Sequence, residues 1–521
     1  MNSPARPLRA LQPARAGISA LLPQADASSG LRLMIIDLNN FARFPTLAIG
    51  LLVAALRGRG HRVDVFCPLA HDVPATERER RETLVDHARR RVHLSDWPPF
   101  LGLRDILRRL HTTRIERVHP VVLREIRKAL ATPPDAILIS AYLQHFNSVG
   151  AIAELAQVRG VPVVLGGPMF NLPEVAEEWR QIPGVSAVVG AEVDRDLPDL
   201  IETLCRKADP LAFAGVVLPD GRRSPAARPL RHLDQTPMAD FTDFPWDRYR
   251  TRIVPIMTGR GCQWDKCLFC SDVISASGRT FRTRSIENVL LEMQEQARRH
   301  ETTNFLFLDL KLNSWPDMIR GIAKGIGRYV QGAEWIGTVH VDQRPDNGLA
   351  RADLAAAAAG GMRRISFGLE SGSQRLLDAM QKGSSVERNA AFIRDAHAAG
   401  LSIRCTMFKG FPGETAADME DTARFLEEHA PWLDRVRFNA FTVHTGTPIW
   451  EAVVQKAEAA EGLAGGLSVT RLDSRRAKAE YHLTEARTPA YRRAKARALE
   501  VVYQINSRPL RDTARQFDGL M

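Results

Sequence analysis

The sequence predicts an α/β protein built on two successive parallel sheets. The first half is expected to form an open, doubly wound sheet and the second a partial (β/α)6 barrel, followed by a helical C-terminal region. Short apolar runs alternate with helical patterns through both halves, which is typical of parallel sheets. A stretch rich in proline and arginine at 208–250 separates the halves. With 521 residues, the chain is long enough for two or three domains that each bury a core.

The first sheet is predicted in residues 30–207. We expect the lead-in at 1–29 to be disordered, because it lacks a continuous apolar core and a small-residue cleavage site. Most apolar runs here are followed by a helical pattern, which implies a Rossmann-like sheet. Ligands of such sheets bind beyond the carboxyl ends of the strands. The strand candidates are Leu31–Ile36, Arg62–Phe66, Ala136–Ser140, Val161–Leu165 and Ala187–Gly190.

The loops beyond these strands carry the candidate ligand-binding residues of the first domain. Gly166 and Gly167 would let a backbone approach a large planar ligand, although a plain tight turn explains them equally well. His145 follows the third strand and, as a single histidine in a loop, is expected at the surface. The candidates are Asn39, Ser140, Tyr142, Gly166, Gly167, Gly190 and Glu192.

The second half is interpreted as an ordered linker at 208–250, a partial barrel at 251–460 and a helical region at 461–521 with a basic face. Six strand-helix units predict that the active site lies at the carboxyl ends of the barrel strands. A helix is expected up to His300 with Ser285 as its N-cap. The strand candidates are Ile253–Met257, Asn304–Asp309, Glu334–Val341, Arg364–Glu370, Leu401–Phe408 and Arg435–Val443.

Three cysteines, Cys262, Cys267 and Cys270, stand in a glycine-led loop, GRGCQWDKCLFCS, directly after the first barrel strand. Three thiolates leave one iron of a four-iron cluster open to a small molecule. Structural zinc would need a fourth ligand, and the nearest downstream histidines, His300 and His340, are remote in sequence. The loop therefore predicts a [4Fe-4S] cluster that takes part in chemistry.

The remaining composition is that of an intracellular enzyme. Cys67, Cys205 and Cys405 are scattered, so no disulfide framework is expected. The net charge of +11 is spread along the chain with few basic residues next to aromatic ones, which disfavours nucleic acid as a partner. No stretch approaches the roughly 18 apolar residues needed to cross a bilayer. We expect a cytoplasmic protein with no membrane partner.

Several motifs at the predicted strand ends resemble those of the radical S-adenosylmethionine (SAM) superfamily. SFGLESGSQRLLDAMQKG at 366–383, MFKGFPGET at 407–415 and FTVHTGTPIWE at 441–451 resemble its fourth, fifth and sixth strand motifs. The usual cysteine spacing is C-x3-C-x2-C, whereas this chain has C-x4-C-x2-C. A flexible ligand loop can absorb one extra residue, so the resemblance implies SAM and a [4Fe-4S] cluster as cofactors.

The resemblance implies a set of SAM contacts. Phe269, between two cysteines, matches the adenine-side contact, and Gly410 would let the fifth-strand backbone pass close to the adenine. Glu370 and Ser371 match the positions that hold the ribose or the methionine amine, although Glu370 could instead cap the following helix. Arg404 is expected either to pair with the SAM carboxylate or to form a structural ion pair.

Two side chains near the same strand ends have open interpretations. Lys311 is expected to form a salt bridge near Asp309, with a role facing the substrate or a cofactor as the alternative. Trp264, inside the cysteine loop, either shields the cluster or simply packs. No catalytic residue is assigned.

The first domain resembles the cobalamin-binding domain that precedes many radical SAM enzymes. PDAILIS, VPVVLGGP and VVGAEVD follow its order, and Gly190 and Glu192 remain of its usual Gly-Glu-Gly-Glu pattern. The resemblance implies that the first-domain candidates given above contact cobalamin. Relatives with a lower axial ligand carry Asp-x-His-x-x-Gly, but Asp37 to Ala42 contain no histidine. We therefore expect no histidine below the cobalt, with His145 as the alternative ligand.

Together the resemblances imply a cobalamin-dependent radical SAM methyltransferase. It would move a methyl group from methylcobalamin to an unactivated carbon of a small-molecule or peptide natural product through a 5'-deoxyadenosyl radical. A low-potential donor such as flavodoxin or ferredoxin would supply electrons. One alternative is cyclisation, ring rearrangement or oxidation without methyl transfer. In another, the first domain is a docking module without cobalamin.

Overall fold

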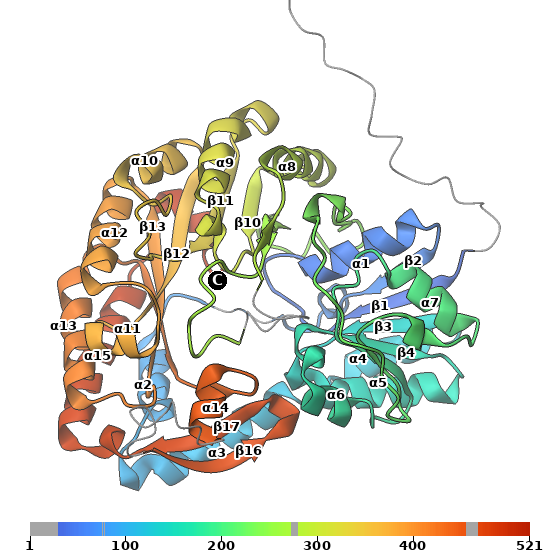
Figure 1. The fold of residues 1–521 in the computed structure, drawn as a ribbon, viewed down its shortest axis with the longest axis horizontal. Helices are drawn as coiled ribbons and strands as arrows, with labels where there is room; N and C mark the ends of the chain where they lie inside the picture. The colour runs from blue at the N-terminus through green and yellow to red at the C-terminus, as the bar shows by residue number, and fades with distance from the viewer. Residues whose placement is uncertain (1–29, 76, 78, 272–279, 455–466, 521) are drawn as a thin grey trace, which may run out of the picture.

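The computed structural model describes residues 30–75, 77, 79–271, 280–454 and 467–520. Two six-stranded sheets lie side by side, each with helices against it (Figure 1). The fold class predicted from the sequence is confirmed. The lead-in at 1–29 and residues 272–279 of the cysteine loop lie outside the described residues. No helix of the described part is long and apolar enough to span a membrane.

The first sheet has the order β2-β1-β3-β4-β5-β6, parallel except for β6, which pairs antiparallel with β5. Alternate residues of β1 enter two different apolar clusters, because the sheet is covered on both faces. β6 comes from the predicted linker, so part of the linker completes this sheet. The strands are β1 (Arg32–Asp37), β2 (Arg62–Phe66), β3 (Ala136–Ser140), β4 (Val163–Gly166), β5 (Val185–Val189) and β6 (Val216–Val217). The helices are α1 (Leu47–Gly58), α4 (Pro120–Ala129), α5 (Phe146–Val158), α6 (Pro173–Trp179) and α7 (Leu197–Cys205).

The second sheet is an all-parallel partial barrel with the order β14-β13-β12-β11-β10-β7. The hydroxyl of Ser285 accepts from the Asn288 amide, which confirms the predicted N-cap. The strands are β7 (Val254–Ile256), β10 (Asn304–Phe307), β11 (Glu334–Val339), β12 (Met362–Glu370), β13 (Ser402–Lys409) and β14 (Arg435–Ala440). The helices are α8 (Ile286–His300), α9 (Pro316–Tyr329), α10 (Arg351–Ala359), α11 (Gln374–Ala379), α12 (Val386–Ala398), α13 (Ala416–His429) and α14 (Pro448–Val454).

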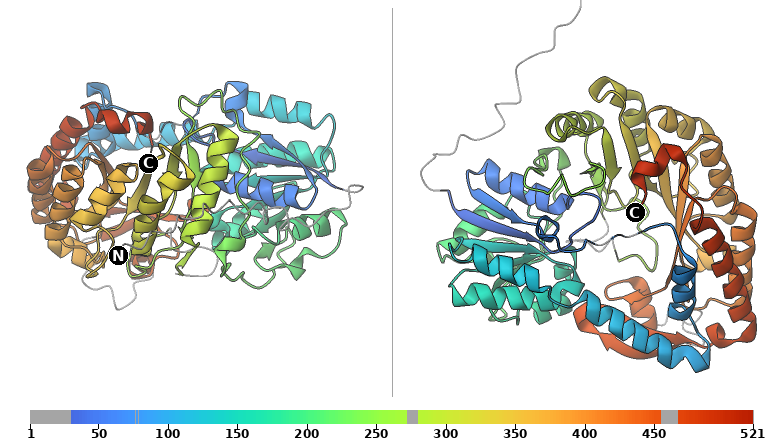
Figure 2. Two further views of the ribbon diagram at one scale, coloured as in Figure 1. Left: turned by 90° about the horizontal axis from the view of Figure 1, so that it is seen from above. Right: turned by 180° about the vertical axis from the view of Figure 1, so that it is seen from behind.

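The end of the chain fills the amino-terminal side of the barrel interior. Phe517 and Leu520 join an apolar cluster with Ile336 and other inward-facing barrel residues. Arg364 of β12, fully buried, donates to the Leu520 carbonyl at 3.1 Å. Figure 2 shows this C-terminal segment against the barrel strands from behind. The opposite, carboxyl-terminal side of the barrel is therefore the side left for a ligand.

Helices α2 (Leu84–His93) and α3 (Pro98–Ile115) lie between β2 and β3 in the sequence but pack against the second half of the chain (Figure 1). The Asp96 carboxylate, between the two helices, binds the ammonium groups of Lys409 and Lys495. The first domain and the barrel are thus interleaved rather than joined only by the linker.

The C-terminal region differs from the prediction, because a β-hairpin precedes its helix. Strands β16 (Leu467–Asp473) and β17 (Lys478–Leu483) pair antiparallel, and β15 (Val443–His444) joins β17. α15 (Pro489–Asn506) then packs against α13 and β14. β17 alternates polar residues with the apolar Ala479, Tyr481 and Leu483, a strand pattern that the helical prediction missed.

Candidate active site

The cysteine loop leaves the end of β7 and is closed by a short antiparallel pair, β8 (Gly259–Arg260) with β9 (Arg282–Thr283). Asp309, just beyond β10, anchors its start by accepting from the amides of Thr258 at 3.1 Å and Gly259 at 2.8 Å. Burial raises the pKa of Asp309 to about 6, although these hydrogen bonds act to lower it. Asp309 therefore positions the loop.

The loop also rests on the segment after α11. The Trp264 indole donates to the Gln381 carbonyl at 2.9 Å, and the Leu268 amide donates to the Met380 carbonyl at 3.1 Å. Trp264 packs against Gly383 so closely that a Cβ there would lie 2.1 Å from the indole. Trp264 is thus a packing residue of the loop, which was one of its two expected roles.

The three predicted ligand cysteines share this loop. Cys267 is buried, and Cys262 and Cys270 are partly buried. Among the described residues, no set of three His, Cys, Asp or Glu side chains stands at metal-binding spacing, so the thiols are not gathered into a preformed site. Burial raises the pKa of Cys262, while the nearby ammonium groups of Lys311 and Lys382 lower it. Three thiols flanked by two cations match the donor set of an anionic iron-sulfur cluster.

Phe269 points into an aromatic group at the ends of β13 and β14. Its ring centroid lies 5.4 Å from that of Phe408, 6.4 Å from Phe411 and 6.2 Å from Phe441. The Lys382 ammonium lies 5.7 Å from the Phe269 centroid. The loop therefore has an apolar wall on one side and a cation on the other.

Glu370 ends β12 and pairs with Lys382. Its carboxylate lies 2.9 Å from the Lys382 Nζ, and both residues are buried. Glu370 has φ of +60°, a left-handed conformation that a non-glycine residue adopts at a cost of order 1 kcal/mol. Ser373 itself caps α11 by accepting from the Leu376 amide, so the alternative role of Glu370 as that cap is wrong.

Ser371 is turned into the protein. It is 1% exposed, and its hydroxyl lies 3.0 Å from that of Thr422 and accepts from the Ser373 amide at 3.1 Å. These contacts fix the turn that follows Glu370. The side chain of Ser371 thus shapes the site through the backbone.

Gly410 follows β13 with φ of +84°, and nothing lies within 4 Å of where its Cβ would be. Its amide donates to the carboxylate of Glu414, and its carbonyl accepts from the Tyr481 hydroxyl. The turn is thus fixed from behind, while the side a Cβ would occupy is open. This fits the predicted close approach of a ligand to the backbone.

Arg404 does not lie with these residues. Its Nε is 2.9 Å from the carboxylate of Glu79, on the amino-terminal side of the barrel where Arg364 binds the same carboxylate at 3.1 Å. Arg404 is 4% exposed. The structural ion pair, one of its two expected roles, is the one observed, and the predicted pairing with the SAM carboxylate is corrected accordingly.

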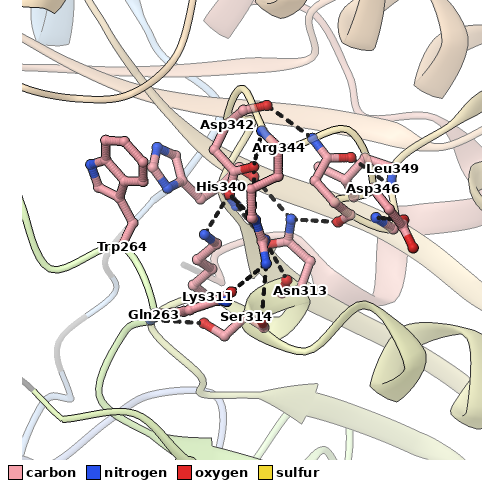
Figure 3. Close-up of polar contacts among 12 residues, drawn as sticks. Gln263, Trp264, Lys311, Asn313, Ser314, His340, Asp342, Arg344, Asp346 and Leu349 are labelled. Atoms are coloured by element: carbon pink, nitrogen blue, oxygen red, sulfur yellow. Dashed lines mark hydrogen bonds and ion pairs between the residues drawn. The ribbon is translucent and has the colours of Figure 1, made fainter.

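A buried polar network beside the cysteine loop was not predicted (Figure 3). Lys311 donates to Asp342, beyond β11, at 2.6 Å, with both side chains at most 1% exposed. Arg344 binds the same carboxylate at 3.0 Å and also reaches the side chain of Gln263 in the loop. Lys311 therefore forms a salt bridge, as expected, but its partner is Asp342 and not the neighbourhood of Asp309.

His340 belongs to this network. It is 7% exposed, and its ring lies 6.2 Å from that of Trp264 in an edge-on contact. Burial and the nearby lysines hold the pKa of His340 well below its usual value, so the ring is neutral. Its Nε2 is buried with no hydrogen-bond partner among the described residues, which marks a polar group that a bound molecule could satisfy.

The first-domain candidates line the carboxyl edge of its sheet. Asp37, Ser140 and Gly166 stand in register on β1, β3 and β4. Asn39 donates its amide to Asp37 at 3.0 Å, and its own Oδ1 is buried with no hydrogen-bond partner in the described part of the chain. Nothing lies within 4 Å of a Cβ built on Gly166. An unsatisfied oxygen and an unobstructed glycine at the same edge of the sheet fit a bound ligand here.

Gly167 and Gly190 are glycines for a different reason. A Cβ on Gly167 would lie 2.5 Å from the Ala141 carbonyl oxygen, and one on Gly190 would lie 2.4 Å from the Phe170 carbonyl oxygen. The close approach is to the protein's own backbone. Of the two explanations weighed for Gly167, the tight turn is the one that the structure supports.

Tyr142 and His145 form a local turn beyond β3. Tyr142 is 40% exposed, and its amide donates to His145 Nδ1 at 3.2 Å. His145 is 7% exposed and burial lowers its pKa to about 4, so the expectation of a surface histidine is wrong.

Glu192 joins the two sheets instead of facing open space. Arg282, in β9, donates to both of its carboxylate oxygens at 2.6 and 2.9 Å, and the Leu230 amide donates at 3.0 Å. Next to it, Asp194 accepts from both Nη atoms of Arg260, in β8, at 2.6 and 2.8 Å. The predicted cofactor contact of Glu192 is therefore replaced by an interdomain ion pair. We call Glu192, Asp194, Arg260 and Arg282 the interdomain clamp.

The β16–β17 hairpin makes a second bridge to the first domain. The Arg475 guanidinium lies 4.0 Å from the Phe146 ring centroid, and Arg476 binds Glu116. Ala477 belongs to the first-domain apolar cluster. The hairpin tip thus reaches the carboxyl edge of the first sheet, beside α5 and α6.

Comparison with known proteins identifies the second half of the chain. The model of the radical SAM superfamily matches residues 256–426, which run from the end of β7 into α13 and include the cysteine loop, Glu370 and Gly410. Residues 256–426 therefore form a radical SAM domain. Its cofactors therefore include a [4Fe-4S] cluster and SAM.

Several similar proteins match more of the chain than this domain. An uncharacterized methyltransferase of Pyrococcus horikoshii is 26% identical over 330 residues, 62% of this chain and 70% of that protein. An anaerobic magnesium-protoporphyrin IX monomethyl ester cyclase of Rubrivivax gelatinosus is 24% identical over 353 residues, 64% of this chain and 61% of that protein. The radical SAM methyltransferase TsrM of Kitasatospora setae, solved with cobalamin and a [4Fe-4S] cluster, superimposes with a TM-score of 0.60 at 16% identity, covering 85% of this chain and 81% of TsrM. The two-domain fold is shared with TsrM.

Proposed function

We propose that this chain is a cobalamin-dependent radical SAM methyltransferase that delivers a cobalt-borne methyl group to an unactivated carbon of a small-molecule or peptide substrate. When bound, the cluster supplies the electron that cleaves SAM, and cobalamin supplies the methyl carrier. A low-potential protein such as flavodoxin or ferredoxin would supply the electrons. The described residues would provide the two binding surfaces and hold them together.

The observation that carries the proposal is the interdomain clamp. Glu192 and Asp194 follow β5 at the carboxyl edge of the first sheet, where open-sheet proteins bind ligands. Arg260 and Arg282 bracket the cysteine loop at the carboxyl end of β7. Their ion pairs join the two ligand-binding edges directly, so two large cofactors would face one cavity.

The proposal assigns residues by their geometry. Cys262, Cys267 and Cys270 would hold the cluster, and Phe269, Glu370 and Gly410 would contact SAM, with Ser371 shaping the turn. Asn39, Ser140, Tyr142 and Gly166 would contact cobalamin, with Gly167 and Gly190 shaping its loops. Arg404 and Glu192 are left out, because Glu79 and Arg282 already bind them.

The first test is anaerobic reconstitution with iron, sulfide and hydroxocobalamin, followed by removal of unbound material and metal analysis. About four irons and one cobalt per chain are expected. Four irons without cobalt would overturn the cobalamin assignment and favour a first domain that serves as a docking module. Zinc without iron would overturn the radical chemistry.

A second candidate function is cyclisation or another ring-forming reaction without methyl transfer, which the similarity to the Rubrivivax cyclase favours. The two differ in what becomes of SAM. A methyltransferase that uses SAM as its methyl source forms S-adenosylhomocysteine together with 5'-deoxyadenosine. A cyclase forms 5'-deoxyadenosine without S-adenosylhomocysteine, so measuring both products with candidate substrates separates the two functions.

A further inference from the structure

Lys382 is held at a fixed place against the cysteine loop. The carbonyls of Met380 and Gln381, the two residues before it, accept from Leu268 and Trp264 of the loop. These anchors lie on either side of Cys267 in the sequence. The two hydrogen bonds fix the backbone that leads into Lys382 against the loop.

The side chain of Lys382 is buried and aimed at the site. It is 8% exposed, its ammonium donates to Glu370 at 2.9 Å, and it lies 5.7 Å from the centroid of Phe269, the residue before Cys270. The charges of Cys267 and Cys270 act on this ammonium, and its charge acts in turn on Cys262. All three thiols therefore interact electrostatically with one buried positive charge.

A buried charge beside a cluster changes the energy of electron transfer. An oxidised four-iron core with three thiolates is anionic, and reduction adds one more negative charge. Net charge and burial are among the main determinants of cluster potential. Because a charge interaction is strong in a partly desolvated site, an ammonium here stabilises the reduced state more than the oxidised one.

We propose that Lys382 tunes the reduction potential of the cluster, its ammonium favouring the reduced state and Glu370 limiting that effect. The inference rests on the proposed cluster at Cys262, Cys267 and Cys270. Glu370 is the counter-charge of the same ammonium, so removing each partner should move the potential in opposite directions. A residue that only packed the loop would not produce opposite shifts.

The test is an anaerobic redox titration of the reconstituted full chain without SAM. The electron paramagnetic resonance signal of the reduced cluster is the readout. Lys382→Met should shift the midpoint potential to more negative values, and Lys382→Arg should stay near the wild-type value. Glu370→Gln keeps the ammonium and should shift the potential to more positive values. Lys409→Met is the matched control, because Lys409 is also a buried lysine. It lies at the end of β13, where its ammonium pairs with Asp96 and not with Glu370. It should leave the potential unchanged.

The outcomes separate this inference from the proposed function. A wild-type chain that yields no four-iron signal overturns the proposed function itself. If the wild-type chain binds the cluster but neither Glu370→Gln nor Lys382→Met, at equal iron content, changes its midpoint potential, the role of Lys382 is overturned. The proposed function then still stands. If Lys382→Met fails to retain iron, the positive shift expected in Glu370→Gln still decides the inference.

Discussion

Arg282 donates through both Nη atoms to the two carboxylate oxygens of Glu192, at 2.6 and 2.9 Å. The two side chains are 9% and 12% exposed. A buried bidentate pair fixes orientation as well as distance. The pair therefore holds the far end of the cysteine loop against the carboxyl edge of the first sheet.

We expect Glu192→Gln to lower both the stability of the fold and the retention of iron. Removing one partner of a buried ion pair typically costs about 3–5 kcal/mol, because the other charge is left uncompensated. The melting temperature and the iron content after reconstitution and desalting should both fall. Glu177→Gln is the control, because its ion pair with Arg180 has a carboxylate that is 39% exposed and should matter by less than about 1 kcal/mol. Equal iron content in Glu192→Gln and wild type would contradict a role of the clamp in holding the loop.

The strands were predictable from sequence, because a parallel strand covered on both faces is a continuous apolar run. Ala136–Ser140, such a run, has its predicted bounds, and so does Arg62–Phe66, an edge strand that alternates polar and apolar residues instead. β13 extends through Lys409, one residue past the prediction, because pairing with β14 continues after the apolar run ends. Apolar patterns thus locate strands and leave their ends to be decided by pairing.

The interleaved segments were not predictable, because distant residues hold them. Asp96 binds Lys409 and Lys495, which lie more than 300 residues away in sequence. β16 is exposed over most of its length and is held by pairing with β17. Its alternation of apolar and polar residues stops after Thr470, where the pairing is irregular. Long-range charge pairing leaves no local pattern in a sequence.

The same limit applies to the candidate site. The cysteines, Glu370 and Gly410 were found through motifs whose spacing is local. Glu192 lies within such a motif and Arg404 just before one, but their partners, Arg282 and Glu79, come from other parts of the chain. For Asp342 and Arg344, a signal did exist, since both follow the carboxyl end of a barrel strand.

Asp96→Asn should separate α2 and α3 from the barrel. The single carboxylate compensates two buried ammonium groups, and its side chain is 13% exposed. Its loss should destabilise the fold by about 3–5 kcal/mol and expose residues 79–116 to limited proteolysis. Asp105→Asn is the control, because Asp105 is 48% exposed opposite Arg104. Identical cleavage rates in Asp96→Asn and wild type would show that the helices are held by other contacts.

Cys267→Ala should lose most of the iron that the wild-type chain binds on reconstitution, because a cluster with two protein thiolates is held poorly. Cys205→Ala should bind as much iron as the wild type. Cys205 ends α7 in the first domain, where its thiol lies 3.6 Å from the Asp135 carbonyl oxygen. Iron and sulfide analysis with the optical spectrum measures both. Equal iron loss in the two variants would mean that the loop does not bind the cluster specifically.

Glu414 should make stability depend on pH. Burial raises the pKa of its carboxyl to about 7, against hydrogen bonds from Tyr491 and Gly410. Because this value lies above the ordinary 4.5, the folded chain keeps a proton that the unfolded chain releases. The contribution of the protonated Glu414 carboxyl to the free energy of unfolding is fully present below about pH 4.5 and is lost as the pH rises to about 7. The pKa difference corresponds to at most about 3 kcal/mol.

Glu414→Gln should remove this dependence, because its amide stays neutral at every pH. The effect is measured by anaerobic urea unfolding between pH 4.5 and 7.5. The quantity compared is the difference between the free energies of unfolding of the variant and the wild type. That difference should change steadily in favour of the variant as the pH rises, whatever other groups contribute, because those are common to both chains. Glu125→Gln, in α4, is the control. Hydrogen bonds from Arg124 and Lys128 lower the pKa of the Glu125 carboxyl, so it stays ionised over this range and the variant should follow the wild-type curve. Parallel curves for Glu414→Gln and wild type would mean that the carboxyl of Glu414 ionises at its ordinary pH in the fold.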